Sequence, residues 1–201
     1  MSHIRSLVVQ GASVTTVIDV LKPRQIAAWS SEINLLPTPL FNFSRKALQQ
    51  QLPSKANLQW WGKRTDETCP LCHEKQTNKH VLNNCSSPAA LDRYKVRHDA
   101  LLRIICSWLN TIIKSPLIMH ADLGGRVYPP LSMIFKHLRP DIAIVGKNCV
   151  TILELTVCHE TNLQKSKLYK CEKYSSIQND CVQNYEKYNC SGSLINDGCP
   201  N

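Results

Sequence analysis

The order of apolar and polar residues predicts a β-hairpin over residues 139–157. Two runs rich in Ile, Val and Leu flank Gly146-Lys147-Asn148, which is the pattern of two strands joined by a tight turn. Each run carries one carboxylate, Asp141 in the first and Glu154 in the second. Because a hairpin brings the start of its first strand to the end of its second, we expect the two acids to meet across the ladder.

Two carboxylates among apolar neighbours repel each other and lose hydration unless a cation lies between them. The sequence therefore predicts that Asp141 and Glu154 bind a hard divalent metal, with Mg²⁺ the usual occupant of such a site. The alternative is that both acids are rim charges of an ordinary hairpin.

A helix after the hairpin places a lysine where it can face these acids. Leu163, Lys170, Tyr174 and Ile177 fall on one helical face, since steps of seven and four residues return to nearly the same angle. Lys170 lies in the middle of this otherwise apolar face, where a lysine is costly unless it meets a negative partner. Lys173 lies at the edge of the face and is equally well explained as a solvated lysine.

The rest of the pattern predicts further helices and two short strands. Helices are expected over Pro23–Leu36, Phe41–Gln51 and Ala89–Lys114, the last capped by Ser87 and Pro88. The expected buried side of the long helix consists of Leu91, Tyr94, Leu101, Ile105, Trp108 and Ile112. Short strands are expected over Pro116–His120 and Gly125–Tyr128.

Cysteines with metal-ligand spacing precede the long helix. Cys69, Cys72, His80 and Cys85 have the spacing C-x2-C-x7-H-x4-C, in which two cysteines hold one side of a Zn²⁺ ion and the later pair closes the tetrahedron. Four protein ligands leave no open coordination position, so this zinc is expected to be structural. His73 is a rival ligand beside Cys72, but the spacing favours His80.

Positive charge is concentrated around this cysteine cluster. The formal net charge is +9, and residues 43–103 hold eleven Lys and Arg against five acids, a net of +6. Such a segment suits the phosphate backbone of nucleic acid, although solubility alone also explains a modest positive charge. Trp60 and Trp61 are expected to pack in a core, and stacking on a base is the weaker alternative. The candidate nucleic-acid contacts are Lys63, Arg64, Lys75, Lys79, Arg93 and Arg97.

Ten cysteines in 201 residues indicate either disulfides or metal. Polar side chains interrupt residues 6–21, which argues against a signal peptide, and the apolar run 101–113 is too short and too polar to span a membrane. We therefore expect an intracellular, reduced setting with no membrane partner, in which cysteines point to metal.

In combination these motifs resemble the C-terminal region of site-specific non-LTR retrotransposon proteins, which carry a restriction-like endonuclease after their reverse transcriptase. Each motif alone is weak, and their order makes the combination specific. The resemblance covers residues 41–177 and rests on Asn57-Leu58-x-x-Trp61, the cysteine–histidine cluster, Tyr94-x-x-Arg97-His98-Asp99, Arg139-Pro140-Asp141, Leu153-Glu154-Leu155-Thr156-Val157 and Lys170-x-x-Lys173-Tyr174.

The resemblance implies an α+β or α/β chain with N-terminal helices, a small zinc knuckle and a nuclease core of the PD-(D/E)XK fold, a mixed sheet flanked by helices. The implied boundaries are 1–64 for the helical segment, 65–87 for the zinc finger, 88–190 for the nuclease domain and 191–201 for a polar tail. Proteins of this family nick target DNA so that the free 3′ hydroxyl primes reverse transcription. Element RNA is a further expected partner, and the nucleus is the expected location.

The resemblance also implies roles for individual residues. Asp141, Glu154 and Lys170 match the family's active site, and the secondary candidates are Lys173, Tyr174, Arg97 and His98. From its position within the long helix alone, Arg97-His98-Asp99 is equally well explained as a solvated face with a local ion pair.

Two features depart from the family. No Tyr-x-Asp-Asp polymerase motif is present, so the chain is interpreted as a fragment of an element or a remnant gene. Residues 179–201 are polar where the family continues into an apolar strand, and a lost strand would expose a sheet edge and weaken the core. The alternative function is therefore a zinc-stabilised nucleic-acid-binding remnant with a decayed nuclease site.

Overall fold

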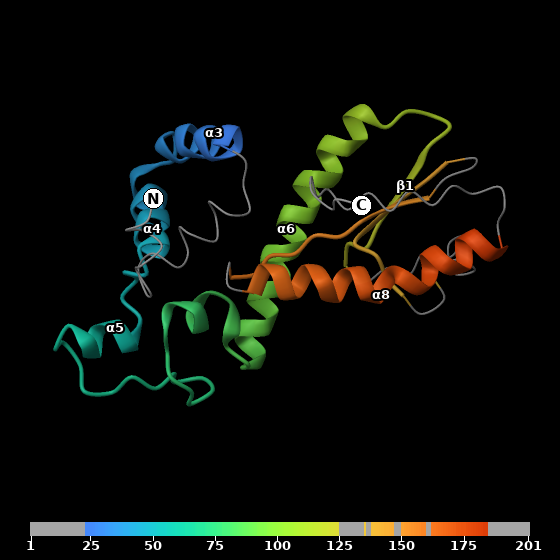
Figure 1. Cartoon of the computed structure of the whole chain (residues 1–201). Helices are drawn as coiled ribbons and strands as arrows, with labels where there is room; N and C mark the ends of the chain where they lie inside the picture. The colour runs from blue at the N-terminus through green and yellow to red at the C-terminus, as the bar shows by residue number, and fades with distance from the viewer. Residues whose placement is uncertain (1–22, 125–134, 136–137, 147–149, 160–161, 185–201) are drawn as a thin grey trace. The chain divides into compact units, whose positions relative to one another are not determined.

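The computed structural model describes residues 23–124, 135, 138–146, 150–159 and 162–184 (Figure 1). The expected strand Gly125–Tyr128, the hairpin turn at residues 147–149 and the tail from residue 185 lie outside the described residues. The chain divides into two compact units. The first holds the described residues up to Leu91 together with Cys158–Leu163, and the second holds Asp92–Val157 and the residues from Gln164 onward.

Among its described residues, the first unit begins with the helices α3 (Pro23–Asn34), α4 (Thr38–Leu48) and α5 (Lys55–Trp60). The first two confirm predicted helices, although α3 ends two residues earlier than expected and α4 begins three residues earlier. Helix α4 begins early because Pro39 fits its first turn, where a backbone N–H has no helical partner.

Helix α5 has only six residues, too few for a hydrophobic period to predict it. Its local signal is Ser54, whose Oγ accepts a hydrogen bond from the Asn57 N–H at 3.4 Å and so caps the start of the helix.

In the part of the second unit that the structure describes, a three-stranded sheet has helices packed against its two faces. Helix α6 (Pro88–Ile112) leads to β1 (Ile118–Ala121), the hairpin strands β2 (Ile142–Val145) and β3 (Val150–Leu153), and helix α8 (Leu163–Asn184). Ser87 caps α6 as predicted, because its Oγ accepts from the Ala90 N–H at 3.3 Å.

The strand order is β1-β2-β3, and the predicted hairpin is confirmed. Its register pairs Ile142 with Leu153 and Val145 with Val150. Every pairing among the described strands is antiparallel, so these strands do not form the mixed sheet that was expected. β1 and β2 run in opposite directions. A mixed sheet would need at least one parallel pair of strands, and such a pair requires a crossover connection.

The two faces of the sheet pack against different helices. On one face, Ala143 and Val150 pack with Phe135, and Tyr174 of α8 contacts this cluster. On the other face, Ile142 packs against α6 residues Leu102, Cys106 and Leu109. The end of the hairpin at which Asp141 and Glu154 lie is therefore within reach of both helices.

The buried side of α6 differs from the prediction. Ile105 packs against the core as expected, but the residues that are buried on the helix are Leu102, Cys106 and Leu109. Four of the predicted residues are exposed: Leu91, Leu101, Trp108 and Ile112. Apolar side chains lie on nearly every side of this helix, so periodicity could not select the face that the sheet covers.

Candidate metal centre and acidic cluster

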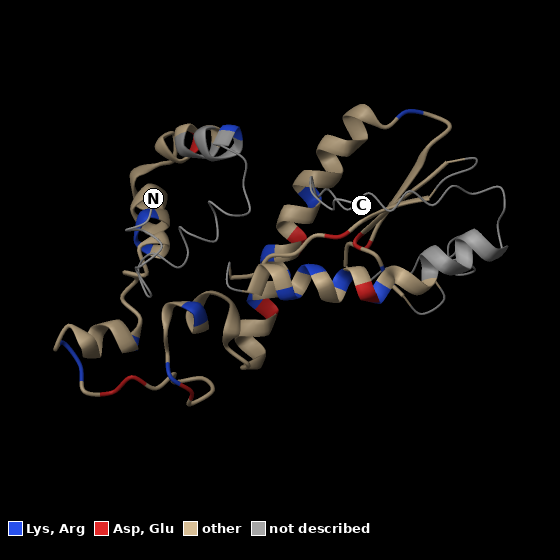
Figure 2. Cartoon of the chain, in the orientation of Figure 1, with Lys and Arg blue, Asp and Glu red and all other residues tan. Residues whose placement is uncertain are grey.

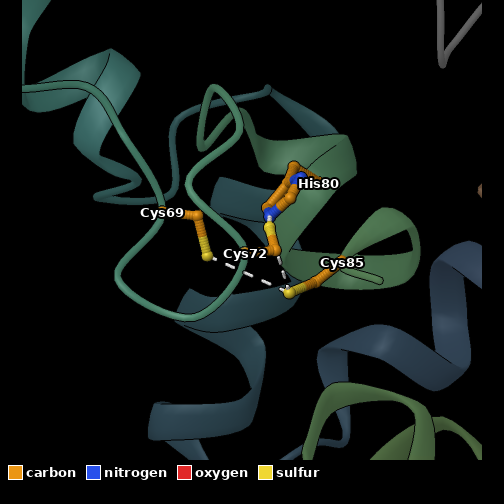
Figure 3. Close-up of side chains that lie close together, drawn as sticks. All are labelled: Cys69, Cys72, His80 and Cys85. Carbon is orange, nitrogen blue, oxygen red and sulfur yellow. Dashed lines mark hydrogen bonds between the residues drawn. The ribbon is translucent and has the colours of Figure 1, made fainter. Parts of the chain in front are cut away.

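Four side chains of the first unit converge on one point (Figure 3). The ligand atoms of Cys69, Cys72, His80 and Cys85 all lie within 4.8 Å of one another, which confirms the predicted grouping. The Sγ of Cys85 is 3.9 Å from that of Cys69 and 3.7 Å from that of Cys72. Sulfur ligands of a tetrahedral zinc, about 2.3 Å from the ion, lie roughly 3.8 Å apart. The cluster could therefore bind a metal such as zinc.

Backbone hydrogen bonds close the turn that carries the first two cysteines. The Cys69 N–H donates to the Glu74 carbonyl at 2.7 Å, and the His73 N–H donates to the Cys69 carbonyl at 2.9 Å. His73 takes a φ of +62° at this turn and is not one of the four converging side chains. The structure thus agrees with the spacing, which favoured His80 over His73.

A single wide helical turn, His80–Asn84, presents the other two ligands and ends at Cys85. The His80 N–H donates to the Oγ1 of Thr77 at 3.1 Å. A carboxylate oxygen of Glu74 lies 3.8 Å from the Nδ1 of His80, while the Nε2 lies 3.3 Å from the Sγ of Cys72. A carboxylate behind a histidine helps to orient the ring toward a metal.

The surroundings of Cys69 and Cys72 shift the pKa values of their thiols in opposite directions. Burial acts to raise the pKa of Cys69, but hydrogen bonds from the Leu71 and Cys72 backbone and from His80 stabilise the thiolate and bring the pKa down to about 6. A backbone hydrogen bond from Glu74 favours the Cys72 thiolate, yet burial and the neighbouring thiols outweigh it, so that pKa is raised. A bound cation would remove the repulsion among the thiolates and favour their joint deprotonation.

Asp141 and Glu154 lie opposite each other just beyond the paired ends of β2 and β3. The Asp141 N–H donates to Glu154 Oε1 at 3.2 Å, and the Leu155 N–H donates to Asp141 Oδ2 at 2.8 Å. The Glu154 side chain is 1% exposed and that of Asp141 is 15% exposed. The structure therefore brings together the two acids that the hairpin pattern placed across the ladder.

Helix α8 adds a cation to the two acids. The Nζ of Lys170 donates to Glu154 Oε2 and lies 3.7 Å from Asp141 Oδ2. Lys173 instead lies with its Nζ 4.7 Å from the centroid of the Tyr174 ring, and the Tyr174 hydroxyl donates to the Arg139 carbonyl at 3.0 Å. Of the two lysines, Lys170 is the one that faces the acids.

A histidine of α6, which the resemblance named as a secondary site candidate, also faces this acidic cluster. The Nε2 of His98 lies 3.5 Å from Asp141 Oδ2, and its Nδ1 lies 3.3 Å from Asp99 Oδ1. The local ion pair expected at His98 and Asp99 is present, and their side chains are 27% and 16% exposed, so this part of the helix face is only partly solvated. The sequence carried one signal for the direction of His98: it precedes the buried Leu102 by four residues and therefore lies on the same face of the helix.

The basic residues predicted to contact nucleic acid differ in their exposure and in the partners that they already have. Lys63 and Arg64 are exposed in the segment that follows α5, where Figure 2 shows basic residues directly after the helix. Lys75 is paired with Glu67 at 2.8 Å. The remaining candidates are Arg93, which is exposed, Lys79, which is half-buried, and Arg97, whose guanidinium lies 5.3 Å from the ring centroid of Tyr94.

The prediction that Trp60 and Trp61 pack in a core is wrong. Trp60 is 77% exposed and Trp61 is 37% exposed. Helix α5 is less than two turns long and has no buried residue, so it has no apolar face that could draw both indole rings into an interior.

No family model, curated protein or solved structure matches the chain. Among the described helices, none combines the length and the apolar character that crossing a membrane requires. The two clusters are therefore the basis for assigning a function.

Proposed function

We propose that the chain is a divalent-metal-dependent phosphodiesterase that nicks DNA, with Asp141, Glu154 and Lys170 as its active site. The observation that carries this proposal is the meeting of two strand acids and one helix lysine, far apart in the sequence, at one end of the sheet. Metal-assisted hydrolysis of a phosphodiester needs ligands for a hard cation and a positive charge for the transition state. These three side chains supply both.

The donor set fits Mg²⁺, which prefers carboxylate oxygens. When bound, Mg²⁺ lowers the pKa of a coordinated water and neutralises charge on the scissile phosphate. Lys170 pairs with both carboxylates, and with a cation held there its ammonium group would orient the attacking water and stabilise negative charge in the transition state. The Leu155 N–H and His98 hold the Asp141 carboxylate in place.

The resemblance to retrotransposon endonucleases supports a DNA substrate and suggests a context. A nick in chromosomal DNA leaves a 3′ hydroxyl, from which a polymerase outside this sequence would copy element RNA. This role would place the protein in the nucleus.

We further propose Zn²⁺ as the occupant of the cysteine–histidine cluster. Metal analysis of the purified chain should return about one zinc per molecule, because a site with four protein ligands binds tightly at neutral pH. Cys85→Ser should lose zinc. Cys171→Ser is the matched control, since Cys171 is exposed and outside the cluster. Unchanged zinc content in Cys85→Ser would contradict the assignment.

A second candidate function is a zinc-stabilised nucleic-acid-binding module with a decayed nuclease site. The contact between Lys170 and the buried Glu154 supports it, because such a pair can be purely structural. The net charge of +6 over residues 43–103 also supports it. Binding of this kind weakens steeply with salt as phosphate contacts release counterions.

Incubation of the zinc-loaded chain with supercoiled plasmid and Mg²⁺ separates the two candidates. We expect conversion to open-circular DNA, and Asp141→Ala should abolish it while affinity for a DNA duplex stays the same or rises slightly. Lys170→Ala should abolish nicking as well, whereas the neighbouring Lys173→Ala should lose much less. A folded wild-type chain that binds the duplex without nicking it would favour the binding module.

A further inference from the structure

Trp60 and Trp61 are consecutive, exposed residues at the end of α5, and neither belongs to the metal centre or to the acidic cluster. Trp60 is 77% exposed and Trp61 37%. Indole rings are among the largest apolar surfaces in a protein and are usually well buried. An exposed pair of this kind offers a stacking surface to a ligand with flat rings.

Backbone hydrogen bonds fix the chain at the end of α5, next to these two residues. The Gly62 N–H donates to the Gln59 carbonyl at 2.9 Å, and the Lys63 N–H donates to the Leu58 carbonyl at 2.8 Å. With Gly62 at a φ of +69°, these two bonds form a Schellman motif. The motif turns the chain directly after Trp61 and places the Lys63 Nζ 5.9 Å from the centroid of that ring.

Helix α5 is also joined to the metal-binding segment. The Nδ2 of Asn57 donates to the Oδ1 of Asn78 at 3.2 Å, and the Ala56 N–H donates to the Gln76 carbonyl at 3.2 Å. The position of the two tryptophans is thus tied to the loop between the second cysteine and the histidine of the cluster.

The charge beside the rings is positive. Lys63 and Arg64 are exposed, and within the part of the chain that the structure describes neither side chain forms an ion pair. The two acids that follow are already paired. The Nζ of Lys55 lies 2.8 Å from Asp66 Oδ2, and the Nζ of Lys75 lies 2.8 Å from Glu67 Oε2. An anionic ligand with flat rings fits this surface better than an apolar segment of another protein.

We propose that Trp60, Trp61, Lys63 and Arg64 form a platform for single-stranded DNA. Unpaired bases would stack on the indole rings, and the phosphates between them would meet the two cations. The bases of a duplex have no free face, so the platform distinguishes a single strand from a duplex. The choice of DNA rests on the proposed nuclease function, because a nicked duplex supplies a strand end that can unpair.

The test measures binding of a labelled twelve-nucleotide oligothymidylate to the full, zinc-loaded chain by fluorescence anisotropy without Mg²⁺. Trp60→Ala should weaken binding about ten-fold, as loss of one base–aromatic stack does. Trp60→Phe should restore most of the affinity, because a phenyl ring also stacks. Trp108→Ala is the matched control: Trp108 is 59% exposed on α6, and its loss should leave affinity unchanged. Zinc content checks that each variant keeps its metal centre.

A duplex of the same length should not respond to Trp60→Ala, and oligouridylate should bind no more tightly than oligothymidylate. Equal losses for duplex and single strand, or no loss from Trp60→Ala, would overturn the proposal. Tighter binding of oligouridylate would assign the platform to RNA and overturn the choice of DNA. Failure of the nuclease proposal is distinguishable, because Asp141→Ala should leave oligothymidylate binding and its dependence on Trp60 intact.

Discussion

At the scale of single residues, the buried carboxylate of Glu154 needs a positively charged partner. Its side chain is 1% exposed, and it accepts hydrogen bonds from the Asp141 N–H and from Lys170 Nζ. A carboxylate removed from water is costly unless it is both paired and hydrogen-bonded. Lys170 should therefore support the fold as well as any chemistry at this site.

Lys170→Met should lower the free energy of unfolding by about 3 kcal/mol, because it leaves a buried carboxylate without its cation. Adding Glu154→Gln to this variant should recover most of the loss, since the buried charge is then gone. Lys173→Met is the control and should change stability by at most about 1 kcal/mol, the value of an exposed cation–π contact. Urea unfolding measures all three. A fully stable Lys170→Met would mean that Glu154 is hydrated in solution.

At the scale of elements, α4 and α5 end in the same motif with different residues. In α4, the Gln50 N–H donates to the Ala47 carbonyl at 3.0 Å and the Gln51 N–H donates to the Lys46 carbonyl at 2.7 Å. Gln50 has a φ of +57°, and Gly62 holds the corresponding position after α5 with +69°. Glycine adopts this left-handed conformation freely, whereas glutamine is strained by its Cβ.

Opposite substitutions at these two helix ends should have opposite effects. Gln50→Gly should raise the free energy of unfolding and Gly62→Ala should lower it, each by about 1 kcal/mol. An added Cβ at Gly62 meets no atom within 4 Å, so the loss would come from the backbone and not from a clash. Thermal unfolding monitored by circular dichroism gives both values. Stabilisation by Gly62→Ala would show that α5 does not end in a left-handed turn.

At the scale of the whole molecule, the two units draw stability from different sources. The buried interior of the second unit is apolar and includes Leu102, Ile142 and Ala143. Several of the buried residues of the first unit are the proposed metal ligands themselves, Cys69, His80 and Cys85. An interior made of ligands depends on its metal, because little apolar surface is buried to replace it.

Removal of zinc by a chelator should therefore unfold the segment 65–87 and leave the sheet intact. Hydrogen exchange followed by mass spectrometry should show loss of protection in peptides around Cys69 and His80, and unchanged protection in β2. Readdition of zinc should restore the original pattern. Faster exchange of β2 in the chelated chain would indicate that the two units fold as one.

The sequence by itself determined the features that depend on neighbouring positions in the chain. The cysteine–histidine spacing predicted the four converging ligands, because a short turn can orient only side chains at set separations. Two apolar runs on either side of a glycine-containing segment predicted the hairpin and the meeting of Asp141 with Glu154. Helical spacing then selected Lys170 over Lys173 as the lysine that faces them.

The tertiary structure alone decided which surfaces are covered. Helix α6 has apolar residues on most of its sides, and only the position of the sheet selects Leu102, Cys106 and Leu109 for burial and turns His98 toward Asp141. Trp60 and Trp61 are exposed because α5 is short and its contacts are polar hydrogen bonds. An apolar side chain is buried only where a helix or strand distant in the sequence packs against it. The local periodicity of the sequence carries no information about that packing.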